Sequence, residues 1–189
     1  MQIPIGIFTV EEAGRVGLSR QKLVELVKTG VLERLSRGLY SRIGGADMAN
    51  LEMVVLAKRG YDFVVALESA LRFHGFTAVS PTRLWVALRR GARRPAVDLP
   101  LEVIRVGNGP FASGVERCDV GGVSVKVYSA AKTVADLFKF RNAVGLEVAL
   151  DALREGWRKR LFSIDELMEY ARIDRVVNVM MPYVEGLVA

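Results

Sequence analysis

Four consecutive polar residues precede an apolar helical pattern near the start of the chain: Ser19, Arg20, Gln21 and Lys22. Serine is a preferred helix N-cap, so the three residues after it occupy the first turn of a helix. Arginine can pair with guanine and glutamine with adenine in bidentate fashion, while serine and lysine suit phosphates or either base. This segment therefore has the chemistry needed to read base edges of DNA.

More basic side chains follow this helix. Residues 31–36 alternate in polarity and residues 39–42 return after a turn at 36–38, which predicts a β-hairpin. The basic residues expected to contact the DNA backbone from the helix end and the hairpin are Lys28, Arg34, Arg37 and Arg42. Alternatively, such charges only solvate a small domain, and helix-turn-helix shapes also occur in proteins that bind other proteins.

The surrounding residues predict the elements that position these side chains. Thr9 caps a first short helix that runs to Arg15, and Glu12 completes a capping box. A turn separates this helix from a second one over residues 20–29, whose apolar side chains lie on one face. Two helices, a turn and a hairpin make a winged helix-turn-helix, in which the second helix enters the major groove.

A second group of basic residues lies further along the chain. Residues 81–97 contain five arginines and no acid, which favours a cationic patch that extends the DNA footprint or meets an acidic partner. A solvated loop with local ion pairs is the alternative. The residues of this predicted patch are Arg89, Arg90, Arg93, Arg94, Lys132, Lys139 and Arg141. Residues 158–160 are basic as well, and we expect them to cap a helix end, whereas Trp157 is expected in a core or domain interface.

The fold class predicted for the whole chain is α+β, with domains at residues 1–45 and 46–189 separated near the linker candidate Gly44-Gly45. In the second domain the pattern predicts strands first, at residues 83–89, 99–106, 118–120 and 123–128, with a Gly121-Gly122 hairpin turn. Helices are expected at residues 47–59 and 65–74, and then at 130–140, 145–155, 164–172 and 176–187. Ser163 is expected to cap the helix at 164–172. Pro182 should kink or restart the last helix.

Several function classes find no support in the residues. With one cysteine and one histidine, Cys118 and His74, neither an intramolecular disulfide nor a Cys/His zinc site can form, and no phosphate-binding or dinucleotide-binding glycine motif is present. Ser129 and Lys132 match the S-x-x-K motif of penicillin-binding enzymes, but a K-T-G motif comes first and ends a helix. We expect no catalytic residue, no metal, no cofactor and no membrane span, and a cytoplasmic location.

The ordered series of motifs resembles the AbiEi-type antitoxins of type IV toxin-antitoxin systems. The resemblance begins at FTVEEAGRVGLSRQKLVELVKTGVLERLSRGLYSR and continues through ESALRFHGF and RRGARRP. It extends over VKVYSAAKTVADLFKFRNAVGLEVALDALREGWRKR and ends at EYARIDRVVNVMMPYVEGL, so it covers nearly all of the chain.

This resemblance implies a repressor that binds inverted repeats in double-stranded DNA near its own promoter through the winged helix. It also implies a C-terminal domain that neutralises a nucleotidyltransferase-like toxin, directly or indirectly. The alternative is a stand-alone winged-helix transcriptional regulator whose second domain senses a ligand or mediates dimerisation.

Overall fold

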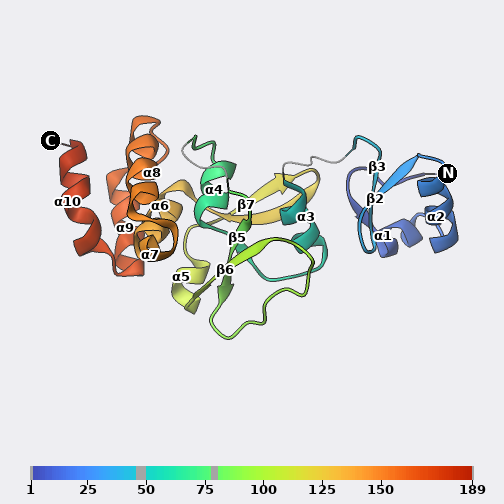
Figure 1. Ribbon diagram of the computed structural model, residues 1–189, viewed down its shortest axis with the longest axis horizontal. Helices are drawn as coiled ribbons and strands as arrows, with labels where there is room; N and C mark the ends of the chain where they lie inside the picture. The colour runs from blue at the N-terminus through green and yellow to red at the C-terminus, as the bar shows by residue number, and fades with distance from the viewer. Residues whose placement is uncertain (1, 46–49, 78–80, 189) are drawn as a thin grey trace. The chain divides into compact units, whose positions relative to one another are not determined.

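The structure is a computed structural model that describes residues 2–45, 50–77 and 81–188. The chain forms two compact units, one of Met1–Asp62 with Cys118–Val125 and one of Phe63–Arg117 with Lys126–Ala189. The fold is α+β, as the sequence predicts, with a winged-helix region followed by strands and then by helices (Figure 1). The predicted boundary at residues 45 and 46 adjoins 46–49, which lie outside the described residues, and it stays a prediction.

The first unit contains the two predicted helices and the hairpin. Its elements are β1 (Phe8–Thr9), α1 (Val10–Arg15), α2 (Arg20–Lys28), β2 (Leu32–Ser36) and β3 (Leu39–Arg42). The predicted capping box is confirmed, because the Thr9 amide donates to Glu12 Oε2 at 2.7 Å and the Glu12 amide donates to Thr9 Oγ1 at 3.1 Å. β3 pairs antiparallel with both β1 and β2, so the hairpin belongs to a three-stranded sheet.

Apolar residues from each of these elements form the core of the module. Ala13 from α1, Leu23 and Leu26 from α2, and Leu32 and Tyr40 from the hairpin are buried together. This unit also contains α3 (Leu51–Lys58), whose predicted range of 47–59 begins outside the described residues.

A five-stranded mixed sheet follows. Its strands are β4 (Val64–Val65), β5 (Leu84–Arg89), β6 (Leu101–Val106), β7 (Val115–Val120) and β8 (Val123–Tyr128). The strand order is β6-β5-β4-β8-β7, with β5 parallel to β6 and β4 parallel to β8. The predicted turn at Gly121 and Gly122 joins β7 to β8, and φ angles of 60° and 82° explain why both positions are glycine.

One predicted helix of this region begins later than the sequence pattern indicates. The helix expected over residues 65–74 is α4 (Leu67–Phe73), and the two valines before it form β4 instead. β4 pairs with both β5 and β8, so hydrogen bonds to distant strands outweigh the local helical pattern. Between β6 and β7 lies a short helix, α5 (Asn108–Ala112), which is held by the buried ring of Phe111.

Helices complete the second unit. They are α6 (Ala130–Lys139), α7 (Arg141–Val144), α8 (Leu146–Arg158), α9 (Ile164–Asp174) and α10 (Val177–Val188). The Ser129 and Ser163 hydroxyl oxygens cap α6 and α9 by accepting hydrogen bonds from the backbone amides three residues on. α6 packs against α4, α8 and α9, and residues 130–138 are all buried. α10 continues through Pro182 rather than restarting there.

Candidate nucleic-acid interface

Buried leucines on one face of α2 anchor the helix and leave its N-terminal end exposed to solvent. Leu23 and Leu26 are buried, and each contributes about 1.5–3 kcal/mol of apolar burial. Ser19 accepts a hydrogen bond from the amide of Lys22 at 3.2 Å, so the helix begins where the sequence predicts. One turn of this helix therefore exposes Arg20 and Gln21 while its opposite face holds the core.

Of the side chains predicted to read bases, two have no polar partner and a third forms an ion pair. The side chains of Arg20 and Gln21 make no hydrogen bond or ion pair with the part of the chain that the structure describes. Lys22 instead pairs with Glu25 at 2.8 Å on the same helix. An exposed ion pair of this kind contributes little to the free energy of folding. Lys22 can therefore exchange Glu25 for a DNA phosphate at small cost.

The hairpin carries the basic residues predicted for backbone contacts. Arg37 and Gly38 form the two-residue turn of the hairpin. The φ of 79° at Gly38 is a left-handed backbone conformation that favours glycine. Arg34 is exposed and Arg42 follows at the end of β3, where its guanidinium donates a long hydrogen bond of 3.5 Å to the Ile3 carbonyl. Lys28 is exposed at the opposite end of α2 from Arg20, so the structure does not bring it to the reading end.

Three of the four acidic residues at positions 2–45 form ion pairs with other cations. Glu11 pairs with Arg15 at 2.7 Å and Glu12 with Lys58 at 2.6 Å. Burial opposes the ionisation of Glu12, but Lys58 and Thr9 outweigh it and lower the pKa of this carboxyl. With Glu25 bound to Lys22, no carboxylate among residues 2–45 and 50–62 forms an ion pair with any of five cations, Arg20, Lys28, Arg34, Arg37 and Arg42.

Two short helices, a basic hairpin and an exposed polar helix start give this region the form of a winged-helix module. Residues 5–43 match the family model described as the AbiEi antitoxin transcriptional regulator. The match spans every element from β1 to β3, and it supports an AbiEi family antitoxin. No curated protein sequence matches the chain.

The predicted basic patch of the second unit is only partly assembled. Arg89 ends β5, where its guanidinium stacks 4.3 Å from the centre of the Phe111 ring, and Arg94 donates to the Leu101 carbonyl at 2.7 Å. Both residues thus brace the loop between β5 and β6. Arg90 and Arg93 are exposed in the same loop, and their side chains make no polar contact with the described residues.

Lys132 is excluded from this patch, which corrects the sequence prediction. Its side chain is fully buried, and its ammonium lies 2.5 Å from Asp136 Oδ1 and 2.8 Å from Asp174 Oδ2. Burial and the nearby Asp174 raise the pKa of Asp136, although the ammonium opposes this shift. Lys132 therefore neutralises buried carboxylates and offers nothing to a surface partner.

The other two predicted patch residues lie close to this cluster. Lys139 is part-buried and its ammonium reaches Asp174 Oδ1 at 3.1 Å, while Arg141 donates to the Phe138 carbonyl at 2.8 Å. Sequence reasoning missed the two aspartates because Asp174 is 42 residues away from Lys132. The available signal was the spacing of Lys132 and Asp136, which places them one helical turn apart.

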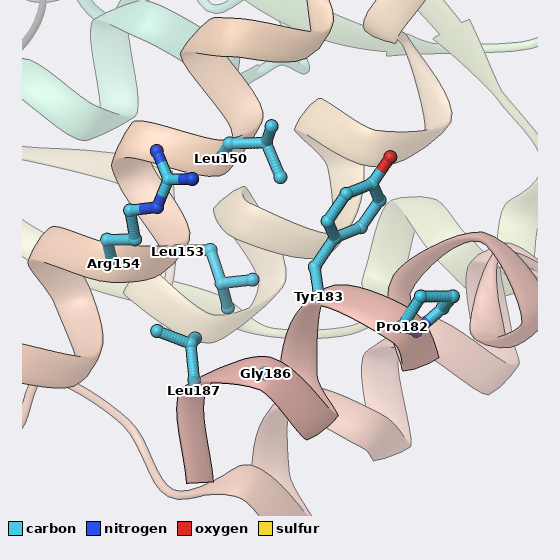
Figure 2. A pocket seen from close by; sticks show the side chains of 7 residues that line it. All are labelled: Leu150, Leu153, Arg154, Pro182, Tyr183, Gly186 and Leu187. Carbon is cyan, nitrogen blue, oxygen red and sulfur yellow. The ribbon is translucent and has the colours of Figure 1, made fainter. Parts of the chain in front are cut away.

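A pocket of about 190 Å³ opens between α8 and α10. Figure 2 shows Leu150, Leu153 and Arg154 on α8 facing Tyr183 and Leu187 on α10. Its lining is mainly apolar, and Arg154 is exposed and pairs weakly with Asp151 at 3.4 Å. The pocket is smaller than the roughly 300–1,000 Å³ typical of sites for drug-sized ligands, and Arg154 lies at its rim.

Metal-binding and membrane-spanning features were also sought. Within residues 2–45, 50–77 and 81–188, no three His, Cys, Asp or Glu side chains gather as a metal site would require. None of the helices in these ranges is long and apolar enough to cross a membrane. His74 follows α4, and its Nε2 lies 2.7 Å from the Tyr128 carbonyl oxygen, which indicates a structural role.

Proposed function

We propose that this protein is a DNA-binding antitoxin of a type IV toxin-antitoxin system. Residues 1–45 repress its own operon by binding inverted repeats near the promoter, and residues 46–189 neutralise a nucleotidyltransferase-like toxin without catalysis. The observation that carries the proposal is the pair of exposed side chains without polar partners, Arg20 and Gln21, at the start of α2 in a module that matches antitoxin regulators.

The proposed contacts divide the cations by role. Arg20 and Gln21 meet base edges in the major groove, because bidentate pairing with guanine or adenine distinguishes sequences. Arg37 and its neighbours on the hairpin meet phosphates, which fix the register of the protein and carry no sequence information. The N-terminal end of α2 adds a favourable dipole for a phosphate, and its first turn contains no acid.

Substitution of the proposed base readers tests this division. We expect Arg20→Ala and Gln21→Ala each to reduce discrimination between operator and unrelated DNA by about 1–3 kcal/mol. Arg37→Ala should weaken binding to all sequences and lower the slope of log K against log salt by about one unit. Fluorescence anisotropy with both DNAs at several salt concentrations measures these quantities.

Arg15→Ala is the matched control, because it removes one exposed cation from α1 that is already paired with Glu11. Its discrimination ratio should equal that of the wild type. Operator affinity that does not change in the Arg20, Gln21 and Arg37 variants would contradict the proposed interface.

The pocket between α8 and α10 favours a second candidate, a stand-alone regulator whose second domain senses a small ligand (Figure 2). Co-expression separates the two functions. An antitoxin relieves the growth arrest caused by the nucleotidyltransferase-like product of a neighbouring reading frame. A stand-alone regulator leaves that arrest unchanged.

A further inference from the structure

Val24 is an apolar side chain on the exposed face of α2. It is 51% exposed, whereas Leu23 and Leu26 are buried and Val27 packs against the core of the module. Valine loses side-chain freedom in a helix, so it is a poorer helix former than alanine, lysine or glutamine. Neither the core nor the stability of the helix therefore explains why position 24 is a valine.

Helix geometry places Val24 beside the two proposed base readers. Arg20 precedes it by four residues and Gln21 by three, and side chains at these spacings are neighbours on one face, with Cβ atoms about 5–6 Å apart. Helical side chains also point back towards the N-terminus, so the Val24 methyl groups cover the surface over the first turn of α2. The exposed face thus presents two methyl groups beside a guanidinium and an amide that have no polar partner among the described residues.

Thymine offers the major groove a group that calls for an apolar partner. Its C5-methyl group is read by apolar contact, whereas the other groups on the base edges are read by hydrogen bonds. A glutamine that reads adenine faces an A·T pair, and this pair carries a thymine methyl group on its other strand. Because base pairs are about 3.4 Å apart, a side chain about 5–6 Å from Gln21 can contact the methyl group of this pair or of the next one.

We infer that Val24 is a specificity-determining residue that contacts the C5-methyl group of a thymine in the operator. The inference rests on the proposed function, and it adds an apolar contact to the hydrogen bonds proposed for Arg20 and Gln21. Deoxyuridine differs from thymidine only by the absence of this methyl group. One chemical change in the DNA therefore isolates the contact.

Contact with another protein chain is the main competing role for an exposed valine. Protein interfaces are marked by contiguous apolar patches. The helical neighbours of Val24 on the exposed face are Arg20, Gln21 and Lys28, so no such patch surrounds it on α2, all of which the structure describes. A small apolar group among polar ones matches the edge of an A·T pair, where the methyl group lies beside hydrogen-bonding atoms.

The test combines one protein variant with one change in the DNA. The probe is the segment upstream of the chain's own reading frame that the wild type protects from nuclease. Further duplexes carry deoxyuridine in place of one protected thymidine at a time. Replacement of the contacted thymidine should weaken wild-type binding about 3–5-fold, as expected for the loss of one buried methyl group.

Val24→Ala should bind the unmodified duplex about 3–5-fold more weakly and should lose the response to deoxyuridine at that position. Alanine is the better helix former, so unfolding does not explain a loss of affinity in this variant. Fluorescence anisotropy at one fixed salt concentration measures the affinities, and circular dichroism verifies folding.

Val16→Ala is the matched control. Val16 is a valine of the same module that is 41% exposed, and it follows α1 rather than lying on α2. This variant should keep both the wild-type affinity and the wild-type response to deoxyuridine. An equal loss of affinity in Val16→Ala would show that exposed valines of the module affect DNA binding without contacting a thymine.

Wild-type binding that is insensitive to deoxyuridine at every protected position would overturn the inference. The same holds if Val24→Ala keeps the wild-type response, or if it changes the oligomeric state seen by light scattering. The proposed function survives these results, because it requires only that the wild type binds its operator. If the wild type protects no upstream DNA, the proposed function and the inference both fail.

Discussion

At the scale of single residues, the feature with the largest expected effect is the buried ammonium of Lys132. It neutralises Asp136 and Asp174, and it lies 4.8 Å from the centre of the Tyr128 ring. Removing one partner of a buried pair leaves an uncompensated charge in a medium of low polarity. The lysine thus matters for stability rather than for recognition.

We predict that Lys132→Met lowers the free energy of unfolding by about 3–5 kcal/mol, because methionine fills the space but leaves two buried carboxylates. Urea denaturation followed by tryptophan fluorescence measures this loss. Arg93→Met, which changes an exposed side chain of the same unit, should change stability by less than about 0.5 kcal/mol. A loss below about 1 kcal/mol for Lys132→Met would show that the cluster relaxes or admits water.

At the scale of elements, the packing between the end of α8 and the segment that leads into α9 depends on a glycine inside α8. Gly156 lies in α8, where glycine normally costs about 1 kcal/mol relative to alanine. The Phe162 ring that leads into α9 packs on its Cα, so the usual preference is reversed. Gly186 in α10 has nothing within 4 Å of an added Cβ and keeps the ordinary preference.

We therefore predict opposite signs for two chemically identical substitutions. Gly156→Ala should destabilise the protein by about 1–3 kcal/mol through overpacking. Gly186→Ala should stabilise it by about 0.5–1 kcal/mol through helix propensity. Thermal and urea unfolding of both variants test this, and stabilisation by Gly156→Ala would mean that Phe162 can move aside.

Element positions followed from the sequence wherever the signal is local. The caps at Thr9, Ser19 and Ser163 and the Gly121-Gly122 turn act within a few residues, and each is confirmed. β4 could not be predicted in this way, because two valines become a strand only through partners about 20 and 60 residues away.

The residues of the candidate site also divide into those with a local sequence signal and those whose surroundings depend on distant residues. The reading residues of α2 follow from one cap and one apolar face, whereas the burial of Lys132 depends on the distant Asp174. Trp157 is 37% exposed rather than in the predicted core or domain interface, and this exposure likewise depends on how Phe162 folds back onto α8. Sequence patterns therefore define the winged helix better than the surface of the second unit.

At the scale of the whole molecule, the free energy of unfolding should fall at acidic pH because Glu155 becomes protonated. This buried carboxylate accepts hydrogen bonds from the amide and hydroxyl of Thr77, 78 residues away, and pairs with Lys159. Burial opposes ionisation, but the Lys159 ammonium and the Thr77 donors outweigh it and lower the pKa of Glu155 to about 2. Because the folded pKa is lowered, its contribution is complete above pH 4.5 and disappears as the pH falls through 2.

Glu155→Gln should therefore lower the free energy of unfolding by about 1–3 kcal/mol at pH 7. The difference from the wild type should shrink between about pH 4.5 and 2, where the wild-type carboxylate becomes protonated. Urea denaturation at pH 7, 4 and 2.5 measures this convergence. A constant difference across that range would assign the effect to packing instead of ionisation.

The distance along the chain between Lys132 and Asp174 also has a consequence for the route by which the second unit folds. A collapsed chain in which α6 is covered before α9 docks holds a dehydrated ammonium without its second carboxylate. Such compact intermediates are penalised, whereas the native arrangement satisfies both charges. The buried cluster thus widens the energy gap between the native state and its competitors on the folding landscape.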